Sequence, residues 1–339
     1  MSMKRFLPLK PLWYQYAKLS DRDKKIYHRV LQGVLNYEKE IPLDGISLPA
    51  GRASRDVVSH VTWLIKFDLP ELFYWDNYKI HYGDRVSVEP EYICTQDRAE
   101  MTLRAIEAKT NRFLATIRHL GDLQKVRSIH DFLITNCSYD DKKREASYRI
   151  DGAILDGLPV CNGFALTFKY MCDRVEVPCL KVRGDVHKST SGNTGHAWNI
   201  VWVGGKPYHV DVTFDAGMTA GKQTIRYDYF LLSDTEIRAD RTQDPTIPVP
   251  PCRISFRYYD YMGLYFERRD AIALKIAAHA KACKPLQFQL PPRWDGRPVN
   301  ADTAHELIRT SLRRVKMDRS WLVWENRDRF IYYVEFKKT

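Results

Sequence analysis

The sequence predicts an α+β fold, and three observations support this prediction. Apolar residues recur at helical spacing through much of the first 135 residues. Three stretches rich in β-branched and aromatic residues then follow between residues 179 and 214, as expected for strands. Four prolines between residues 240 and 251 mark a linker, after which a short mixed segment completes the chain. Separate runs of helices and strands are typical of α+β proteins.

Composition limits the classes of protein to which the chain can belong. With 339 residues, 44% hydrophobic and 28% charged, it is long and apolar enough to bury a sizeable core. No apolar run reaches the roughly eighteen residues of a membrane span, and the basic first 25 residues lack the pattern of a secretory signal. Seven scattered cysteines without a CxxC pair argue against disulfides and structural zinc. We therefore expect a cytoplasmic protein that binds no membrane.

The first 120 residues are predicted to form a helical N-terminal region with one β-hairpin. A helix follows Ser20, which together with Asp23 forms a capping box. A Gly83-Asp84 turn between two alternating stretches predicts the hairpin. Helical spacing predicts two further helices, at 54–66 and 97–119.

A central domain is predicted over residues 121–240. Its helices begin at Asp122, ending before Cys137, and at Cys161, ending near Val175. Its strands are predicted at 179–183, 196–203 and 206–214.

Residues 241–339 are predicted to form a small basic α+β domain after the proline-rich linker. Its expected elements are strands at 254–259, 285–290, 319–325 and 329–336, and helices at 268–283 and 301–314. The chain carries a net charge of +11, of which +8 falls within residues 251–339. Because no nucleic-acid-binding motif accompanies this charge, we interpret it as a solvated surface and expect no nucleic-acid partner.

Cys161 is the first candidate for a functional side chain. It directly precedes an apolar-faced helix, where the helix dipole and unpaired N–H groups favour the thiolate, the nucleophilic form of cysteine. The same N–H groups can receive the oxyanion that forms when a carbonyl is attacked. Gly163, two residues further on, is expected to keep the thiol accessible.

His196 and Asp211 are predicted to meet across a hairpin. Gly204-Gly205 is a favourable two-residue turn, and the register that it sets makes His196 and Asp211 diagonal neighbours on one face. Diagonal side chains lie about 7–8 Å apart, so an imidazole and a carboxylate can lean together. Asp215, Asp185 and Asp151 compete for the acidic role but lack this placement.

Four nearby residues receive weaker interpretations. Trp198 shares the face of His196 and either shields it from water or caps the core. Asn199 lies on the opposite face and is expected to serve packing or turn hydrogen bonding rather than a catalytic role. His187 and His209 have no partner at motif spacing.

These segments together resemble a known family. The chain has CxGxA opening a helix at Cys161, HAWN opening a strand at His196, and VDVTFD around Asp211. In this order the motifs resemble the transglutaminase-like superfamily of papain-type cysteine enzymes, and most closely its bacterial transglutaminase-domain proteins. IHDFLITNCSYD at 129–140 and YFLLSDTEI at 229–237 add to the likeness.

The resemblance implies a core helix that carries the cysteine, packed on an antiparallel sheet that carries the histidine and the aspartate. It implies Cys161 as nucleophile, His196 as base and Asp211 as the acid that orients it. Animal members place a tryptophan upstream of the cysteine to help hold the oxyanion, and here none occurs between Trp75 and Trp198. Tyr139 or Tyr148 is the candidate substitute, the alternative being a packed aromatic.

The expected activity is attack on an amide of a protein or peptide substrate through a thioester acyl-enzyme. Hydrolysis is favoured over crosslinking because no segment marks an amine-acceptor site, although an amine remains an alternative acceptor. No cofactor or metal is required, and the acidic clusters of calcium sites are absent from the sequence. The alternative is a protein-binding scaffold on the same fold that has lost catalysis.

Overall fold

The computed structural model describes residues 3–7, 14–187, 192, 194–294 and 296–337. The chain divides into two compact units. The first comprises Met1–Pro207, Asp211–Thr213 and Thr242–Pro251, and the second comprises Tyr208–Val210, Phe214–Arg241 and Cys252–Thr339. The first unit thus includes nearly all of the proline-rich stretch, and the second unit contains chain from both sides of it.

The first unit begins with helices and a small antiparallel sheet. Short elements η1 (Met3–Phe6), α1 (Tyr14–Lys18) and η2 (Pro70–Leu72) accompany the long helices α2 (Asp21–Leu35), α3 (Arg52–Asp68) and α4 (Gln96–Ile117). The sheet has the order β1-β3-β2, with β1 (Ile41–Pro42), β3 (Ser87–Tyr92) and β2 (Trp75–His81). The predicted hairpin and three long helices are thus present.

The N-terminus of α2 has half of the predicted capping box. Ser20 Oγ accepts a hydrogen bond from the backbone N–H of Asp23, at 3.2 Å. The Asp23 carboxylate instead accepts from Arg22 Nε at 2.8 Å. The serine cap alone satisfies one of the unpaired N–H groups with which a helix begins.

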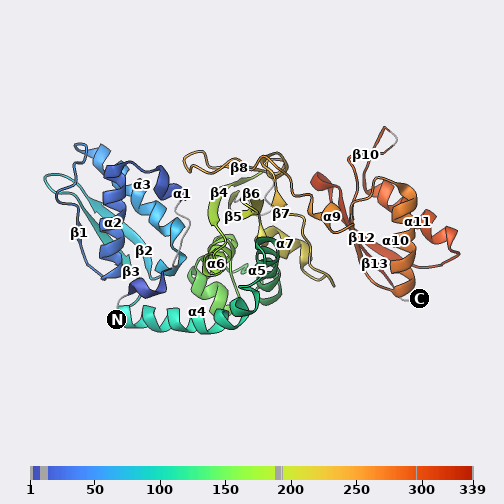
Figure 1. Cartoon of the computed structure of the whole chain (residues 1–339), viewed down its shortest axis with the longest axis horizontal. Helices are drawn as coiled ribbons and strands as arrows, with labels where there is room; N and C mark the ends of the chain where they lie inside the picture. Colours follow the sequence, from blue (N-terminus) through green and yellow to red (C-terminus); the bar gives the residue numbers. More distant parts are fainter. Residues whose placement is uncertain (1–2, 8–13, 188–191, 193, 295, 338–339) are drawn as a thin grey trace. The chain divides into compact units, whose positions relative to one another are not determined.

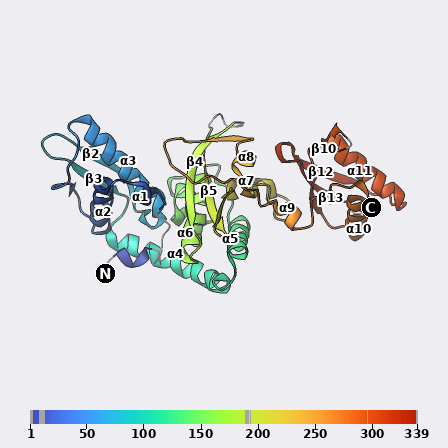
Figure 2. The same cartoon turned by 45° about the horizontal axis from the view of Figure 1, so that its top comes forward.

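The centre of the first unit places helix α6 (Cys161–Arg174) on an antiparallel pair of strands, β4 (Cys179–Val186) and β5 (Gly195–Val203) (Figure 1). Helix α5 (Asp122–Asn136) packs beside α6, and this arrangement is also visible in the tilted view (Figure 2). A short η3 helix (Glu145–Tyr148) and a π-helical turn, η4 (Gly152–Asp156), connect α5 to α6. The predicted mixed fold, with the cysteine helix on an antiparallel sheet, is confirmed.

The predicted strand over 206–214 is wrong in its second half. Strand β6 ends at Val210 (Lys206–Val210), and α7 (Val212–Thr219) follows after Asp211. Two contacts explain the change of structure. The Asp211 carboxylate bonds to His196, and the Asp215 carboxylate, in the first turn of α7, accepts the backbone N–H of Tyr229 at 2.9 Å. The apolar alternation of this segment is therefore overridden by tertiary contacts.

The second unit contains β7 (Phe230–Leu232), which pairs with β6, and helix α8 (Asp234–Ile237). Its C-terminal part has a three-stranded sheet of order β12-β13-β9. Its elements are α9 (Tyr258–Tyr261), α10 (Arg269–Ala282), β9 (Leu286–Gln289), β10 (Arg293–Trp294), β11 (Arg297–Pro298), α11 (Ala301–Arg314), β12 (Trp321–Asn326), η5 (Arg327–Arg329) and β13 (Ile331–Phe336). One further strand, β8 (Arg241–Gln243), stands at the boundary of the two units.

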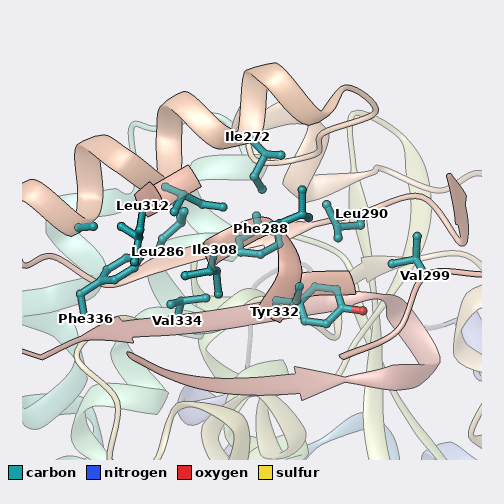
Figure 3. Close-up of a cluster of buried hydrophobic side chains, with 14 of the residues drawn as sticks. Ile272, Leu286, Phe288, Leu290, Val299, Ile308, Leu312, Tyr332, Val334 and Phe336 are labelled. Carbon is teal, nitrogen blue, oxygen red and sulfur yellow. The ribbon is translucent and has the colours of Figure 1, made fainter. Parts of the chain in front are cut away.

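The C-terminal sheet and its two helices enclose a separate apolar core. Ile272 of α10 and Ile308 of α11 meet Phe288, Tyr332 and Val334 of the sheet, and all five are buried (Figure 3). One predicted strand in this region, at 254–259, is wrong. Arg257 adopts a positive φ of 53°, which ends any extended run, and α9 begins at the next residue.

No helix within the described ranges has both the length and the apolar character that crossing a membrane requires. All seven cysteines fall in those ranges, and each is a free thiol.

Several charged side chains are buried where α6 meets the N-terminal helices. Lys169 Nζ of α6 bonds to Asp173 Oδ2 at 2.8 Å and to the Cys179 carbonyl at 3.1 Å. Asp68, at the end of α3, accepts from the Tyr27 hydroxyl at 3.1 Å. Burial raises the pKa of Asp68 to about 7, although the positive charge of Lys169 partly offsets this. The interactions with Lys169 and Tyr27 therefore do not fully offset the desolvation cost of the Asp68 carboxylate in the folded protein.

This burial predicts a stability difference that depends on pH. A carboxyl whose pKa is raised by folding stabilises the protein below its unfolded pKa, and the contribution is lost as the pH rises through the folded value. We therefore expect Asp68→Asn to raise the free energy of unfolding relative to wild type at pH 8. At pH 5 the variant should have nearly the same free energy of unfolding as wild type, or a smaller one. Urea unfolding at the two pH values measures this, and an equal effect at both would contradict it.

Candidate active site

The start of α6 holds Cys161 against the preceding η3 segment. Val160 caps the helix without a side-chain bond, and its N–H donates to the Ser147 carbonyl at 2.9 Å. Gly163 faces the same carbonyl, and a Cβ at this position would lie 2.3 Å from the Ser147 oxygen. Gly163 therefore allows close packing of the helix against this segment.

His196, near the start of β5, meets Asp211, which follows the last residue of β6. The His196 Nε2 to Asp211 Oδ2 distance is 2.7 Å, and both side chains are buried. The predicted pairing of these two side chains is present, but the strand does not continue past Asp211 as the assumed register requires. The bond joins residues that are fifteen positions apart in the sequence.

The electrostatics of the site couple the thiol to the imidazole. Burial lowers the pKa of His196, but the charge and hydrogen bond of Asp211, together with Cys161, raise it to about 9. Burial also raises the pKa of Cys161. The hydrogen bond and positive charge of His196 and the N–H of Ala197 outweigh this and leave the pKa of Cys161 below its ordinary value. Both shifts favour a thiolate–imidazolium pair.

A second group of the same three residue types provides an internal contrast. Cys252, His209 and Asp234 lie in the second unit, with donor atoms within 4.8 Å of one another. His209 Nε2 is 3.0 Å from Asp234 Oδ1, a partner that the sequence reading did not find. Burial raises the pKa of the Cys252 thiol to about 12, so without a metal ion this group remains protonated. Its donor set suits a transition metal, whereas only Cys161 has the electrostatics of a nucleophile.

The two candidate tyrosines stand near Cys161 on the loop before α6. Both are 42% exposed, so neither is a packed core aromatic. Burial and then the negative charge of Cys161 raise the pKa of Tyr139 to about 12. The Tyr148 carbonyl accepts a hydrogen bond from Asn162 Nδ2 at 2.7 Å. The phenol of Tyr139 therefore interacts electrostatically with the Cys161 thiolate and stays protonated near neutral pH.

Asp140 fixes the loop that carries both tyrosines. Its carboxylate accepts from the Arg144 guanidinium at 3.0 and 3.1 Å and from the Ser147 hydroxyl. These bonds hold the pKa of Asp140 well below its ordinary range, the bond from Arg144 contributing most. Because Ser147 also contacts Val160 and Gly163, the carboxylate of Asp140 connects the loop to the start of α6.

The residues that flank His196 have structural contacts. The Trp198 ring lies 6.1 Å from the His196 ring at an interplanar angle of 16°, and it is 1% exposed. Asn199 Nδ2 donates to the Ala165 carbonyl at 2.9 Å and to the Leu180 carbonyl at 3.1 Å, so its hydrogen bonds join separate elements and do not lie within a turn. Asn199 thereby ties β5 to the Cys161 helix.

The competing acidic residues have other partners. Asp185 Oδ1 accepts from Thr194 Oγ1 at 2.8 Å, and Asp151 pairs with Arg149 Nε at 3.1 Å. Asp215 bonds to the Tyr229 backbone, as described above. His187 Nε2 lies 2.9 Å from Thr242 Oγ1. These contacts leave Asp211 as the acid beside His196.

A cavity of about 920 Å³ adjoins the Cys161 helix within the first unit, and sequence reasoning missed it. Asn162 and Leu166 of α6, Lys181 and Arg183 of β4, and aromatic residues of α3 and β2 line it. The sequence signal was the HVTWLIKFD and WDNYKI stretches, whose bulky rings alternate with basic residues. We call it the basic cavity, because six of its lining residues are Lys or Arg and one is Asp.

Comparison with known families gives the site its context. The model of the transglutaminase-like superfamily matches residues 111–212. These residues form a transglutaminase-like domain. The matched range contains Cys161, His196 and Asp211. The parts of the chain outside 111–212 are not covered by this match.

Two curated relatives share the domain. Kyphoscoliosis peptidase of Mus musculus is 31% identical over 125 residues, which covers 32% of this chain and 19% of the mouse protein. Kyphoscoliosis peptidase of Homo sapiens is 30% identical over 124 residues, with the same coverage. The match thus spans about a fifth of the length of these relatives.

Solved structures of similar proteins include a cysteine protease, described as putative, from Cytophaga hutchinsonii. It has 14% identity and a TM-score of 0.28 over 40% of this chain and 61% of that one. A crystal structure described as a TGase has 13% identity and a TM-score of 0.32, and covers 58% of this chain and 60% of that one.

The coupling of Cys161 to His196 predicts a perturbed thiol reactivity. We expect alkylation of Cys161 by iodoacetamide to reach half its maximal rate at a pH below that of an unperturbed thiol. Asp211→Asn removes the negative charge that raises the pKa of His196, so the midpoint should move to higher pH. Mass spectrometry of the labelled chain at each pH measures the rate, with buried Cys252 as internal reference. A wild-type midpoint at or above the ordinary thiol pKa would contradict the thiolate assignment.

Proposed function

We propose that the chain is a cysteine enzyme that attacks an amide of a protein or peptide with Cys161, assisted by His196 and Asp211. The observation that carries the proposal is the 2.7 Å buried contact of His196 with Asp211, beside a thiol whose pKa is lowered by that imidazole. This combination of nucleophile, base and orienting acid is the one that acyl transfer to a thiol requires.

The proposed reaction has two covalent stages. The Cys161 thiolate attacks the carbonyl carbon, and the carbonyl oxygen gains the negative charge of a tetrahedral intermediate. The carbon–nitrogen bond then breaks, the leaving amine or ammonia takes a proton from His196, and a thioester remains. Water next attacks the thioester while His196 accepts its proton, which yields the carboxylic acid and restores the thiol.

Oxyanion stabilisation is assigned to the start of α6 and to Tyr139. The first N–H groups of a helix lack intrahelical acceptors and lie at the positive end of its dipole. Tyr139 supplies a second donor, because its phenol stays protonated near the thiolate. Tyr148, the other candidate from the sequence, remains the alternative donor.

Hydrolysis is favoured over transfer to an amine. The charged groups that line the basic cavity next to the Cys161 helix are mostly cationic, and a cationic amine acceptor would be repelled by them. An amine remains an alternative acceptor on a different approach to the thioester. A catalytically inactive scaffold on the same fold remains the second candidate, favoured by the long segments outside the matched domain.

A turnover experiment separates these functions. We expect wild-type protein, incubated with a peptide library and a primary amine, to release new carboxyl termini or convert Gln to Glu, with little amine incorporation. Mass spectrometry reads each product, and Cys161→Ala is the matched variant that should form none while keeping peptide binding. Predominant amine incorporation would make the enzyme a transferase, and binding without any product in wild type would favour the scaffold.

Removal of single hydroxyl groups tests the oxyanion assignment. We expect Tyr139→Phe to lower kcat by about a hundredfold with a small change in KM, because one donor to the transition state is lost. Tyr148→Phe, on the same loop and equally exposed, should lower kcat far less. If Tyr148→Phe has the larger effect on kcat, the role belongs to Tyr148 instead.

A further inference from the structure

The basic cavity contains a buried cation that lacks a counter-ion. Lys181 of β4 lines the cavity and is 7% exposed. Its ammonium lies 3.8 Å above the ring centroid of Phe67, a cation–π contact. Among the residues that the structure describes, no carboxylate or hydrogen-bond acceptor lies within bonding distance of this ammonium. A buried charge without such a partner is costly, and a bound anion would offset that cost.

The other buried or half-buried cations of the cavity already have partners. Arg183 bonds to Asp244 and stacks 4.7 Å above the Trp63 ring, and Arg149 pairs with Asp151. Lys66 donates to the Asp76 carbonyl. Lys181 is thus distinguished by its burial together with its missing acceptor, and not by the general charge of the surface.

The cavity lies close to the proposed nucleophile. Asn162 and Leu166, which line it, belong to the same helix as Cys161, and Asn162 is the next residue in the chain. Burial lowers the pKa of Lys181 to about 7, nearby Lys66 and Arg183 act in the same direction, and the negative charge of Cys161 opposes them. The electrostatic influence of Cys161 therefore reaches the Lys181 ammonium.

The walls of the cavity suit a peptide. Trp63, Phe67, Trp75 and Tyr78 provide aromatic surface, and a few charged groups stand among them. Binding sites with mostly aromatic walls and a small number of placed polar groups use the walls for affinity and the polar groups for specificity. The chemistry of the polar group decides which ligand is selected.

We propose that the basic cavity binds a carboxylate of the acyl-donor peptide and that Lys181 is the counter-ion of this carboxylate. The inference rests on the proposed function, because it places the peptide in the cavity while its amide lies at Cys161. A single buried ammonium matches a single negative charge, and two of the three arginines that line the cavity, Arg183 and Arg149, are already paired with carboxylates. The preferred substrate is therefore an acidic peptide.

The carboxylate has two sources, an acidic side chain or a free C-terminus. The full chain with Cys161→Ala, which prevents turnover, is titrated with N-acetylated, C-amidated nine-residue Ala/Gln peptides by calorimetry. One Glu replaces a Gln at successive positions, and each peptide is also made with a free C-terminal acid. Because Gln has nearly the shape of Glu without its charge, the ratio of the two dissociation constants isolates the carboxylate.

We expect Glu at one position, or the free C-terminal acid, to tighten binding by about tenfold over the neutral peptide. Lys181→Met, which keeps the length and apolar stem of the side chain, should abolish this preference, so that the ratio of dissociation constants is about one. Lys79→Met is the matched control, because Lys79 also lines the cavity but is exposed and lies near Glu89 and Glu91 at 3.8 and 3.5 Å. It should keep most of the preference.

Equal binding of the neutral and acidic peptides would overturn the proposal without any change to Lys181, so the test does not depend on the folding of a variant. A preference that survives in Lys181→Met would also overturn it. Failure of the proposed function is distinguishable, because it would appear as no product from wild type with the acidic preference in binding intact.

Discussion

The site depends on one buried contact, the 2.7 Å bond between His196 and Asp211. Burial alone would lower the pKa of His196 and make the imidazole a weaker base, so the proton would stay on Cys161. The carboxylate of Asp211 reverses this balance, and the pKa of His196 reaches about 9 as a result. The lowered pKa of the thiol then follows from the charged imidazole rather than from the helix start alone. The contrast with Cys252, whose pKa burial raises to about 12 beside a similar His–Asp pair, shows that placement decides the outcome.

The scaffold around this contact serves to hold three short segments together. Asn199 bonds β5 to α6, so the strand that carries His196 cannot shift along the helix that carries Cys161. Asp140 fixes the loop before α6, and Gly163 lets that loop approach the helix backbone. A close approach of this kind is possible only without a Cβ, because the added atom would overlap the Ser147 carbonyl. These contacts make the relative positions of nucleophile and base a property of packing rather than of loop conformation.

Sequence reasoning could find the features that depend on local pattern. The amphipathic helices, the first hairpin and the order of Cys161, His196 and Asp211 all follow from spacing and residue type, as does the match to a transglutaminase-like domain. Sequence reasoning failed where tertiary contacts determine the local structure. The alternation of Val212 and Phe214 suggested a strand, yet the bonds of Asp211 and Asp215 turn this segment into a helix. The partner of His209 lies twenty-five residues away, and the basic cavity is formed by stretches that only the fold brings together.

The aromatic wall of the basic cavity comes from α3 and β2, whereas Cys161, His196 and Asp211 lie within 161–211. The wall and the Cys–His–Asp group therefore come from separate stretches of the chain, and Lys181 lies in the second of them. Substitutions between residues 55 and 82 can change the shape of this wall without altering Cys161, His196 or Asp211. Relatives whose similarity is limited to the second stretch are free to have a different wall, so likeness within that stretch does not predict the surface beside the cysteine.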